Sequence, residues 1–390
     1  MIKQVTVKAG VNRENTRRYT EGGWYDCNRI RFRQGTPQTI GGCTPISLTA
    51  IYSGICRALW NWSTLGGTLY TGIGTNTAYY ILSQADQSLN NITPFVTSDQ
   101  VTNALTATTG STTLTISVGS HLPSVGDAVI LSGATALGGA ITASVLNGVE
   151  YVVTSVSSGS YTVSLGVTAT SGDTGHGGTT VVHFELPVGA ATSISSPSVA
   201  GYGTGVYSAS AYGYSLPTTG AVPIRLWHQN NYGEDLVLGP RSGSVYYYGA
   251  RYGLLDKPIT SFSAPSTIGM ANSFFAGDPI IFVGKGASSL PTGLTYGTTY
   301  YVLSPSSISF TVAATPGGAP VTFTGSGSGT NYVSCRAFDI SKWGTDANYP
   351  SVQEFVLVSD IYRFVFAFGC NDYSSTAQNP MLIRWSDQQN

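Results

Sequence analysis

Residues 113–118 read Thr113-Leu114-Thr115-Ile116-Ser117-Val118, with polar and apolar side chains in alternation. Comparable short runs lie at Tyr161-Thr162-Val163-Ser164-Leu165 and at Phe355-Val356-Leu357-Val358. Because successive side chains of a strand point to opposite faces, such runs are typical of half-buried β-strands. Gly or Pro interrupts nearly every window that could form a helix, and Gly-Gly, Asn-Gly, Ser-Gly and Pro-Gly pairs separate the runs. The sequence therefore predicts an all-β protein.

Composition limits the class of protein further. The chain has 390 residues, of which 42% are hydrophobic and 9% are charged, and its formal net charge is -1. Ordinary globular proteins are about 25% charged. A chain this hydrophobic folds rather than staying disordered, and its near-zero charge argues against binding DNA by bulk electrostatics. The length suggests two or three domains.

Targeting segments and cysteine patterns add little. Residues 1–10 show no apolar stretch behind Lys3 and Lys8, and no run approaches the ~18 apolar residues of a membrane helix, so we expect no membrane segment. The five cysteines are widely spaced without a Cys-x-x-Cys pair, which favours free thiols in a reducing compartment. A disulfide between two of them stays open.

Positive charge is concentrated at the N-terminus. Eight of the 18 Lys and Arg residues lie in residues 1–33, and residues 58–224 contain neither. Such an arm is either a solvated surface, a protein-docking segment or a DNA contact, and we favour protein docking. The candidate subunit or adaptor contacts are Arg13, Arg17, Arg18, Arg29, Arg31 and Arg33. Because the last three are spaced by two, a strand would place them on one face, with Ile30 and Phe32 on the other face packed against the scaffold.

A hairpin unit repeats along the chain at a constant offset of 167 residues. Both copies read as Leu-Trp, a polar turn, an apolar strand ending in Gly, and a strand ending in paired tyrosines. The matched residues are Trp60, Gly72, Tyr79 and Tyr80 in the first copy and Trp227, Gly239, Tyr246 and Tyr247 in the second. A looser third copy ends at Trp385. Repeated hairpins of this kind predict blades of a propeller-like scaffold.

A second repeat lies between the hairpin units. Gly126–Ile130 is similar to Gly277–Ile281, and Ser160–Val163 is similar to Ser309–Val312. We therefore predict two related β-sandwich or barrel modules that interrupt the scaffold and leave from its loop tips. The expected divisions are 1–98 (arm and first hairpin), 99–184 (module 1), 185–256 (second hairpin), 257–335 (module 2) and 336–390 (third hairpin).

No catalytic pattern stands out, so we expect a protein without enzymatic activity, cofactor or metal. The four histidines lack zinc-ligand spacing, and Gly325–Gly329 has no following Lys-Ser/Thr. Ser171–Gly175 is similar to the start of the Asp-box of sialidase propellers but lacks its closing aromatic, so we expect a turn. The Tyr-rich residues 201–214 could instead contact carbohydrate or protein.

The scaffold pieces resemble the tail nozzle proteins of short-tailed bacteriophages, also described as tail tubular or packaged-DNA stabilisation proteins. The resemblance covers roughly the scaffold and depends on the order of its motifs. These are Gly22-Gly23-Trp24-Tyr25-Asp26-Cys27-Asn28, Arg29-Ile30-Arg31-Phe32, Gly41-Gly42, Gly201–Tyr207, Tyr212-Gly213, Gly233-Glu234-Asp235-Leu236, Gly239-Pro240 and Leu382-Ile383-Arg384-Trp385-Ser386-Asp387.

The resemblance implies a virion structural protein of the phage tail, made in the cytoplasm of the bacterial host. Its expected assembly is a homo-oligomeric ring, a homohexamer, below the portal and head-to-tail adaptor proteins and in contact with tail fibre or needle proteins. Viral DNA would be retained by this ring and would pass through its lumen at ejection without sequence-specific binding. Nozzle proteins are usually longer, and three hairpins do not close a propeller. The alternative function is a phage adhesin, or fibre-attachment protein, that binds host surface glycans.

Overall fold

The computed structural model describes residues 8–14, 16, 18–19, 22–42, 51–189, 226–344, 348–359 and 361–388. Almost every regular element in these residues is a β-strand, and only one short α-helix, α1 (Ala143–Leu146), accompanies two 3-10 turns. The prediction of an all-β protein is confirmed. The expected propeller stays a prediction. The prediction that the two modules fold independently of the scaffold is also untested. Arg17, Cys43 and the Tyr-rich residues 201–214 lie outside the described residues.

The arm forms a unit of its own, residues 1–49. Its strands β1 (Ile30–Arg33) and β2 (Thr36–Thr39) pair antiparallel, with Arg33 opposite Thr36. The connecting residues Gln34 and Gly35 have φ values of 50° and 81°. Two successive positive φ values form the tight turn whose twist matches that of a two-stranded hairpin.

The scaffold contributes three small antiparallel sheets to the unit of residues 50–390. The first sheet contains β3 (Cys56–Ser63), β4 (Leu69–Thr75), β5 (Tyr79–Ser83) and β6 (Leu89–Asn91). The second contains β15 (Trp227–Tyr232), β16 (Asp235–Pro240), β17 (Tyr246–Tyr248) and β25 (Phe338–Asp339). The third contains β26 (Phe355–Val358), β27 (Val365–Phe368) and β28 (Ile383–Trp385). Short 3-10 turns follow β17 at Ala250–Tyr252 and β25 at Ile340–Lys342.

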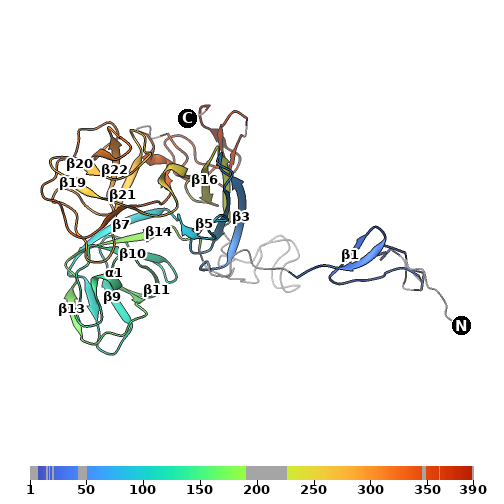
Figure 1. Ribbon diagram of the computed structural model, residues 1–390, viewed down its shortest axis with the longest axis horizontal. Coiled ribbons are helices and arrows are strands. Elements are labelled where there is room, and N and C mark those ends of the chain that lie inside the picture. Colours follow the sequence, from blue (N-terminus) through green and yellow to red (C-terminus); the bar gives the residue numbers. More distant parts are fainter. Residues whose placement is uncertain are drawn as a thin grey trace, which may run out of the picture. The chain divides into compact units, whose positions relative to one another are not determined.

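These three sheets stack face to face in chain order. β3 of the first sheet packs against β15 of the second, and β26 of the third packs against β15 and β16 (Figure 1). Aromatic side chains, among them Trp62, Tyr79 and Trp227, fill the space between the first and second sheets. Valines, among them Val237 and Val356, fill the space between the second and third. The second sheet is therefore covered on both faces.

The two modules share one strand order. The first has the order β7-β14-β10-β11-β12-β9-β8-β13, and the second has the order β18-β24-β21-β22-β23-β20-β19. The first module's strands are β7 (Phe95–Thr102), β8 (Leu105–Ala107), β9 (Thr113–Ser117), β10 (Ala128–Ser132), β11 (Glu150–Ser157), β12 (Ser160–Ser164), β13 (Asp173–His176) and β14 (Thr179–Glu185). Those of the second are β18 (Lys257–Pro258), β19 (Ser261–Ser263), β20 (Thr267–Gly269), β21 (Pro279–Gly284), β22 (Thr299–Leu303), β23 (Ser309–Ala313) and β24 (Asn331–Val333).

The modules differ from the sequence expectation in two details. The first begins at Phe95 rather than at 99, because β7 pairs with β14 along its whole length. The turn expected at residues 171–175 is wrong in part, since Asp173–His176 forms β13 on the open edge of β8. The modules also contact each other: the Ser132 hydroxyl accepts a hydrogen bond from the Gly284 amide at 3.0 Å.

A glycine of the hairpin repeat provides a test of the stacking between the second and third sheets. A Cβ added at Gly239 would lie 2.6 Å from the Ser244 carbonyl oxygen and 2.8 Å from Nε2 of the buried Gln353. We expect Gly239→Ala to lower the free energy of unfolding by about 1–3 kcal/mol, because the added methyl group overpacks this contact. Urea denaturation followed by tryptophan fluorescence measures the change.

Gly66→Ala is the matched control. Gly66 lies in an exposed turn, has no positive φ, and has only the Thr64 hydroxyl within 4 Å of an added Cβ, at 3.7 Å. Equal stability of the two variants would show that the second and third sheets are not packed as closely as described.

Candidate functional site

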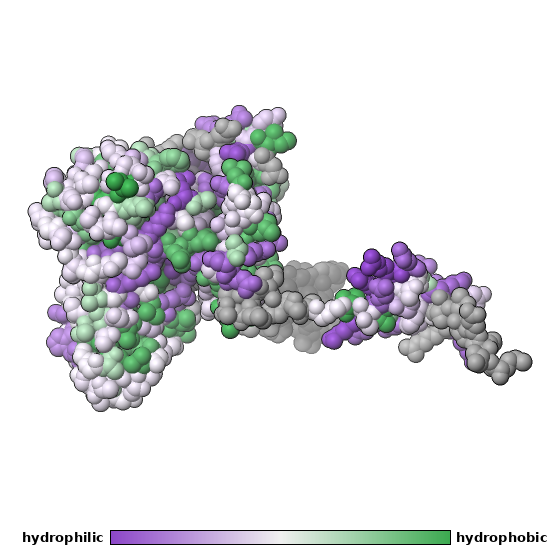
Figure 2. Space-filling view, in the orientation of Figure 1, coloured by the Kyte–Doolittle hydropathy of each residue, from purple (hydrophilic) through white to green (hydrophobic). Residues whose placement is uncertain are grey.

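The arm hairpin exposes two of the six arginines predicted to bind a partner. Along β1, Arg31 and Arg33 are exposed, whereas Ile30 and Phe32 are half-buried. Phe32 packs edge-on against Trp24, with ring centroids 5.8 Å apart. The apolar face of β1 therefore has a partner within the arm, and its expected packing on the scaffold stays a prediction. In the view of Figure 2 the arm is strongly hydrophilic, and much of the modules' surface is pale.

The remaining arm arginines do not join this face. Arg29 precedes β1 with a φ of 57°, so it lies outside the alternation that we predicted for it. Arg13 forms an exposed ion pair with Asp26 at 2.5 Å, and Arg18 is exposed. Two guanidinium groups on one strand face are well suited to bidentate binding of carboxylates.

The residues of the hairpin repeat divide between two faces. Tyr79 and Trp227 meet edge to face at 5.2 Å between the first and second sheets, and Tyr246 belongs to the same core. Tyr80 and Tyr247 belong to clusters on the opposite faces of their sheets. Tyr79 and Tyr246, which are matched at the offset of 167, thus point toward each other across this interface, whereas Tyr80 and Tyr247 point away from it. A shift of one residue in a strand reverses its faces, which is how a sequence repeat can lose structural equivalence.

Hydrogen bonds fix two of the tryptophans at this core, Trp227 and Trp60. The Trp227 Nε1–H donates to the Thr75 carbonyl oxygen at 2.7 Å, and the Trp60 Nε1–H donates to the side-chain oxygen of Asn231. Gly72 lies opposite Trp60 and beside the Tyr79 hydroxyl, where a Cβ would clash. Trp385 differs from the other two repeat tryptophans because its side chain is 67% exposed.

The outer face of the third sheet is apolar and, apart from the His228 ring of the second sheet, whose centroid lies 4.7 Å from that of Phe355, is uncovered by the described residues. Leu357 lies opposite Phe366, which lies opposite Trp385, and the neighbouring row has the same composition. Directly opposed residues share a face. The outer-face residues, called here the end face, are Phe355, Leu357, Phe366, Phe368, Ile383 and Trp385. Sequence reasoning missed this face, although the alternation of Phe366 and Phe368 around Ala367 was visible.

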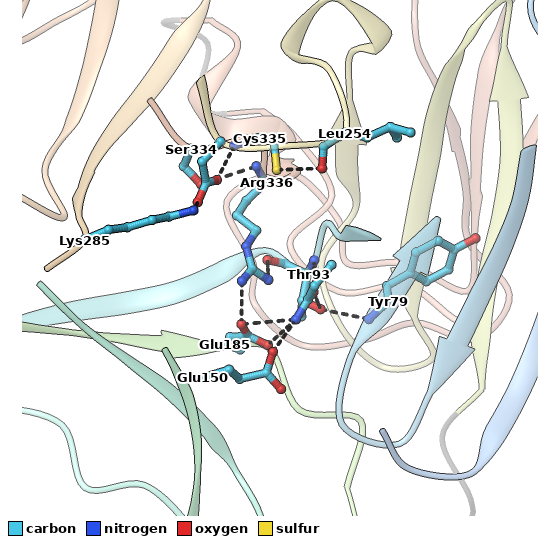
Figure 3. A network of polar contacts seen from close by, with 11 residues as sticks. Tyr79, Thr93, Glu150, Glu185, Leu254, Lys285, Ser334, Cys335 and Arg336 are labelled. Carbon is cyan, nitrogen blue, oxygen red and sulfur yellow. Dashed lines mark hydrogen bonds and ion pairs between the residues drawn. The ribbon is translucent and has the colours of Figure 1, made fainter. Parts of the chain in front are cut away.

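A buried polar junction joins the scaffold to both modules (Figure 3). Arg336, on the segment that leaves module 2, forms an ion pair with Glu185 of β14 at 2.8 Å. The Asn91 side chain of β6 donates to Glu150 of β11 at 2.7 Å and to Glu185 at 3.2 Å. The Thr93 hydroxyl accepts from the Tyr79 amide at 2.8 Å. The junction therefore links the first sheet, module 1 and the end of module 2 through one set of contacts.

Burial controls the ionisation of the groups at the junction. Loss of solvation raises the pKa of Glu185 to about 7, because it outweighs the attraction of Arg336 and is reinforced by Glu150. The neighbouring His183 is buried, with each ring nitrogen 3.0 Å from a serine hydroxyl, of Ser98 and of Ser132. Burial, with the charge of Arg336, lowers the pKa of His183 to about 3. Burial also raises the pKa of the Cys335 thiol.

Metal-binding clusters and membrane-spanning helices are absent from the described part of the chain. Within those residues no three His, Cys, Asp or Glu side chains come together as a metal site, and Cys27, Cys56, Cys335 and Cys370 are free thiols. None of the helices found there is long and apolar enough to cross a membrane.

Comparison with known proteins gives no family. No family model and no curated protein matches the sequence. Among solved structures, the chain is similar to phage phi92 endosialidase at 16% identity and a TM-score of 0.20. The match covers 87% of this chain and 56% of that chain, so this chain spans little more than half its length. A likeness of this size is no basis for assigning a fold or a function.

The Glu185→Gln variant isolates the titration of the junction carboxyl. The folded-state pKa of about 7 lies above the ordinary value of 4.5, so between these values the folded state holds a proton that the unfolded state has lost. This contribution to stability is complete below the unfolded pKa and is lost as the pH rises through 7. Relative to E185Q, we expect the unfolding free energy of the wild type to fall by up to about 1.4 kcal/mol per pH unit, measured by urea denaturation.

The comparison with E185Q removes the effect of His183, because this histidine is present in both chains. Its titration changes the stability with pH in the direction opposite to that of Glu185. Its lowered pKa means that stability is lost as the pH falls below the ordinary histidine value. A wild-type-to-variant difference that stays constant between pH 4.5 and 7 would contradict the raised pKa of Glu185.

Proposed function

We propose that this chain is a non-enzymatic structural subunit of a phage tail, a nozzle ring subunit that retains packaged DNA and conducts it at ejection. The observation that supports this proposal most is the end face, an apolar surface at one end of a stack of three small sheets. A soluble monomer rarely exposes a contiguous apolar patch of this kind, and such patches mark interaction sites. The tail location, the six-fold ring and its adaptor partners rest on the resemblance of the scaffold motifs to nozzle proteins.

The partner of the end face is a second copy of this chain. At the other end of the stack, the outer face of the first sheet exposes Leu59 to 62% and Leu69 to 51%, beside Ile73 and Tyr80, which are buried on the same face. The sheets within the chain already pack face to face, and a second copy would continue this stacking by placing its first sheet on the end face. Because the two surfaces are unlike, the contact is heterologous, and such contacts form a ring when the rotation between subunits closes.

Removing apolar surface from the end face should abolish assembly. We expect the wild-type chain to form closed rings, and Leu357→Ser/Phe366→Ser to be monomeric with its fold retained, because the cross-strand pair that it replaces lies on the contact. Leu59→Ser should weaken the same contact from the other side. Mass photometry gives the oligomeric state, and circular dichroism checks the fold.

Ile308→Ser is the control, because Ile308 is 72% exposed on module 2, away from both ends of the stack. A wild-type chain that stays monomeric at micromolar concentrations, or a double variant that still assembles, would refute the self-assembly contact. An open filament would retain the contact and refute the ring.

The arm supports the same proposal through its paired arginines. We expect Arg31→Glu/Arg33→Glu to block attachment of the ring to the head of the particle, because charge reversal repels partner carboxylates. Ring formation itself should survive. Attachment is measured by electron microscopy of particles complemented with the variant, and Lys342→Glu, an exposed cation of the scaffold, is the control. Normal attachment with altered DNA ejection would mean that the arm contacts DNA.

A further inference from the structure

A cleft of about 860 Å³ lies between the second and third sheets of the scaffold. Its volume falls in the range of about 300–1,000 Å³ that is usual for small-molecule sites. Apolar side chains of the inter-sheet core, including Val237, Val245 and Val365, form part of its lining. The remaining lining combines aromatic and polar residues with further aliphatic ones such as Ile340, Leu382 and Ile383.

Aromatic rings form a continuous row on the second-sheet side of the cleft. Tyr232 and Tyr247 lie 6.2 Å apart at an interplanar angle of 71°, and Tyr247 and Trp343 lie 4.8 Å apart at 74°. In these near-perpendicular pairs the edge of one ring meets the face of the next, so neighbouring rings along the row differ in orientation. The Arg251 guanidinium lies 5.3 Å from the Trp343 ring and is held by Asp278 at 2.7 Å, so this end of the row is rigid.

Planar polar groups form the third-sheet side. The Arg384 guanidinium stacks 4.4 Å from the Tyr373 ring and donates to the carbonyl oxygens of Asn348 at 2.5 Å and Asn371 at 3.1 Å. Tyr373 itself is 61% exposed. Asp372 and Asp387 also line the cleft, so two acidic residues balance the two arginines. A lining with balanced charges disfavours a strongly ionic ligand and suits one that is rich in hydroxyl groups.

Two hydrogen-bonding atoms of the lining residues lack a partner. The Tyr232 hydroxyl and the Trp343 Nε1–H are buried and make no hydrogen bond within the described residues. Buried polar groups are nearly always paired in folded proteins. Both residues stand in the aromatic row, where a ligand hydroxyl that enters the cleft could pair with them after a small side-chain movement.

We propose that this cleft binds an uncharged oligosaccharide. The C–H faces of sugar rings stack on tyrosine and tryptophan rings, and sugar hydroxyls exchange hydrogen bonds with carboxylates, guanidinium groups and backbone carbonyls, which are the groups present here. The site would hold its ligand by side chains that are already fixed by one another. This activity goes beyond the assembly role proposed above. Ile383 and Trp385 of the end face also line the cleft, but the aromatic row contains no end-face residue.

The test is binding of the full chain to a printed array of uncharged hexose and N-acetylhexosamine oligosaccharides, with sulfated and sialylated glycans as the charged comparison. Isothermal titration then gives the affinity for the oligosaccharide with the strongest signal. Tyr373→Ala should weaken binding at least tenfold, because it removes an exposed stacking face, whereas Tyr373→Phe should retain binding within about threefold. Trp343→Phe should weaken binding by removing the unpaired donor.

Tyr362→Ala is the control, since Tyr362 is an aromatic residue of the same region, 57% exposed, that does not line the cleft. Binding of charged glycans alone, no binding to any uncharged oligosaccharide, or equal affinity of Tyr373→Ala and wild type would each overturn the proposal. A photo-crosslinking residue at position 373 that captures a second copy of the chain would also overturn it and assign the cleft to subunit contact. The assembly variant Leu357→Ser/Phe366→Ser should still bind the oligosaccharide, which separates failure of this proposal from failure of the ring.

Discussion

The ion pair between Arg336 and Glu185 is the contact on which the arrangement of residues 51–388 depends. Both side chains are buried, and they come from the two points where the chain returns from its modules to the scaffold. Removal of either partner would leave a buried charge without compensation, which costs more than the pair contributes. Asn91 extends the pair to the first sheet, so the entry and exit of module 1 are anchored at one place. The sheets on either side are held mainly by apolar packing, with the hydrogen bonds of Trp227 and Trp60 between the first and second sheets.

The scaffold shows how packing between sheets can dominate over sequence repetition. Its first interface is aromatic and contains hydrogen-bonded tryptophans, and its second is built of valines and leaves a cleft beside them. Paired tyrosines such as Tyr79-Tyr80 place one ring on each face of a sheet, so each pair contributes to two different clusters. An aromatic pair in a strand is thus a way of joining three layers with two residues. The third sheet lacks such a pair, and its outer face is the one that remains open.

Local structure could be predicted from the sequence, and the sites could not. The runs at 113–118, 161–165 and 355–358 correspond to β9, β12 and β26, because side-chain alternation is a property of the strand itself. The similar segments of the two modules fall on equivalent strands for the same reason. Glu185 and Arg336 are 151 residues apart, and no local pattern connects them. The repeat alignment does not give the faces, because the strand pairing differs between the copies: Gly74 lies opposite Tyr79, whereas Leu238 lies opposite Tyr246.

The pairing of the first and last strands within each module affects how such a chain can gain or lose modules in evolution. Phe95 lies opposite Glu185, and Lys257 lies opposite Val333, so each module leaves and rejoins the scaffold at adjacent points. A segment whose ends meet can be duplicated, lost or exchanged without moving what flanks it. The common strand order of the two modules is what a duplication would leave behind. The two modules now contact each other through Ser132 and Gly284. Replacement of one module by another would therefore have to preserve this contact or replace both modules together.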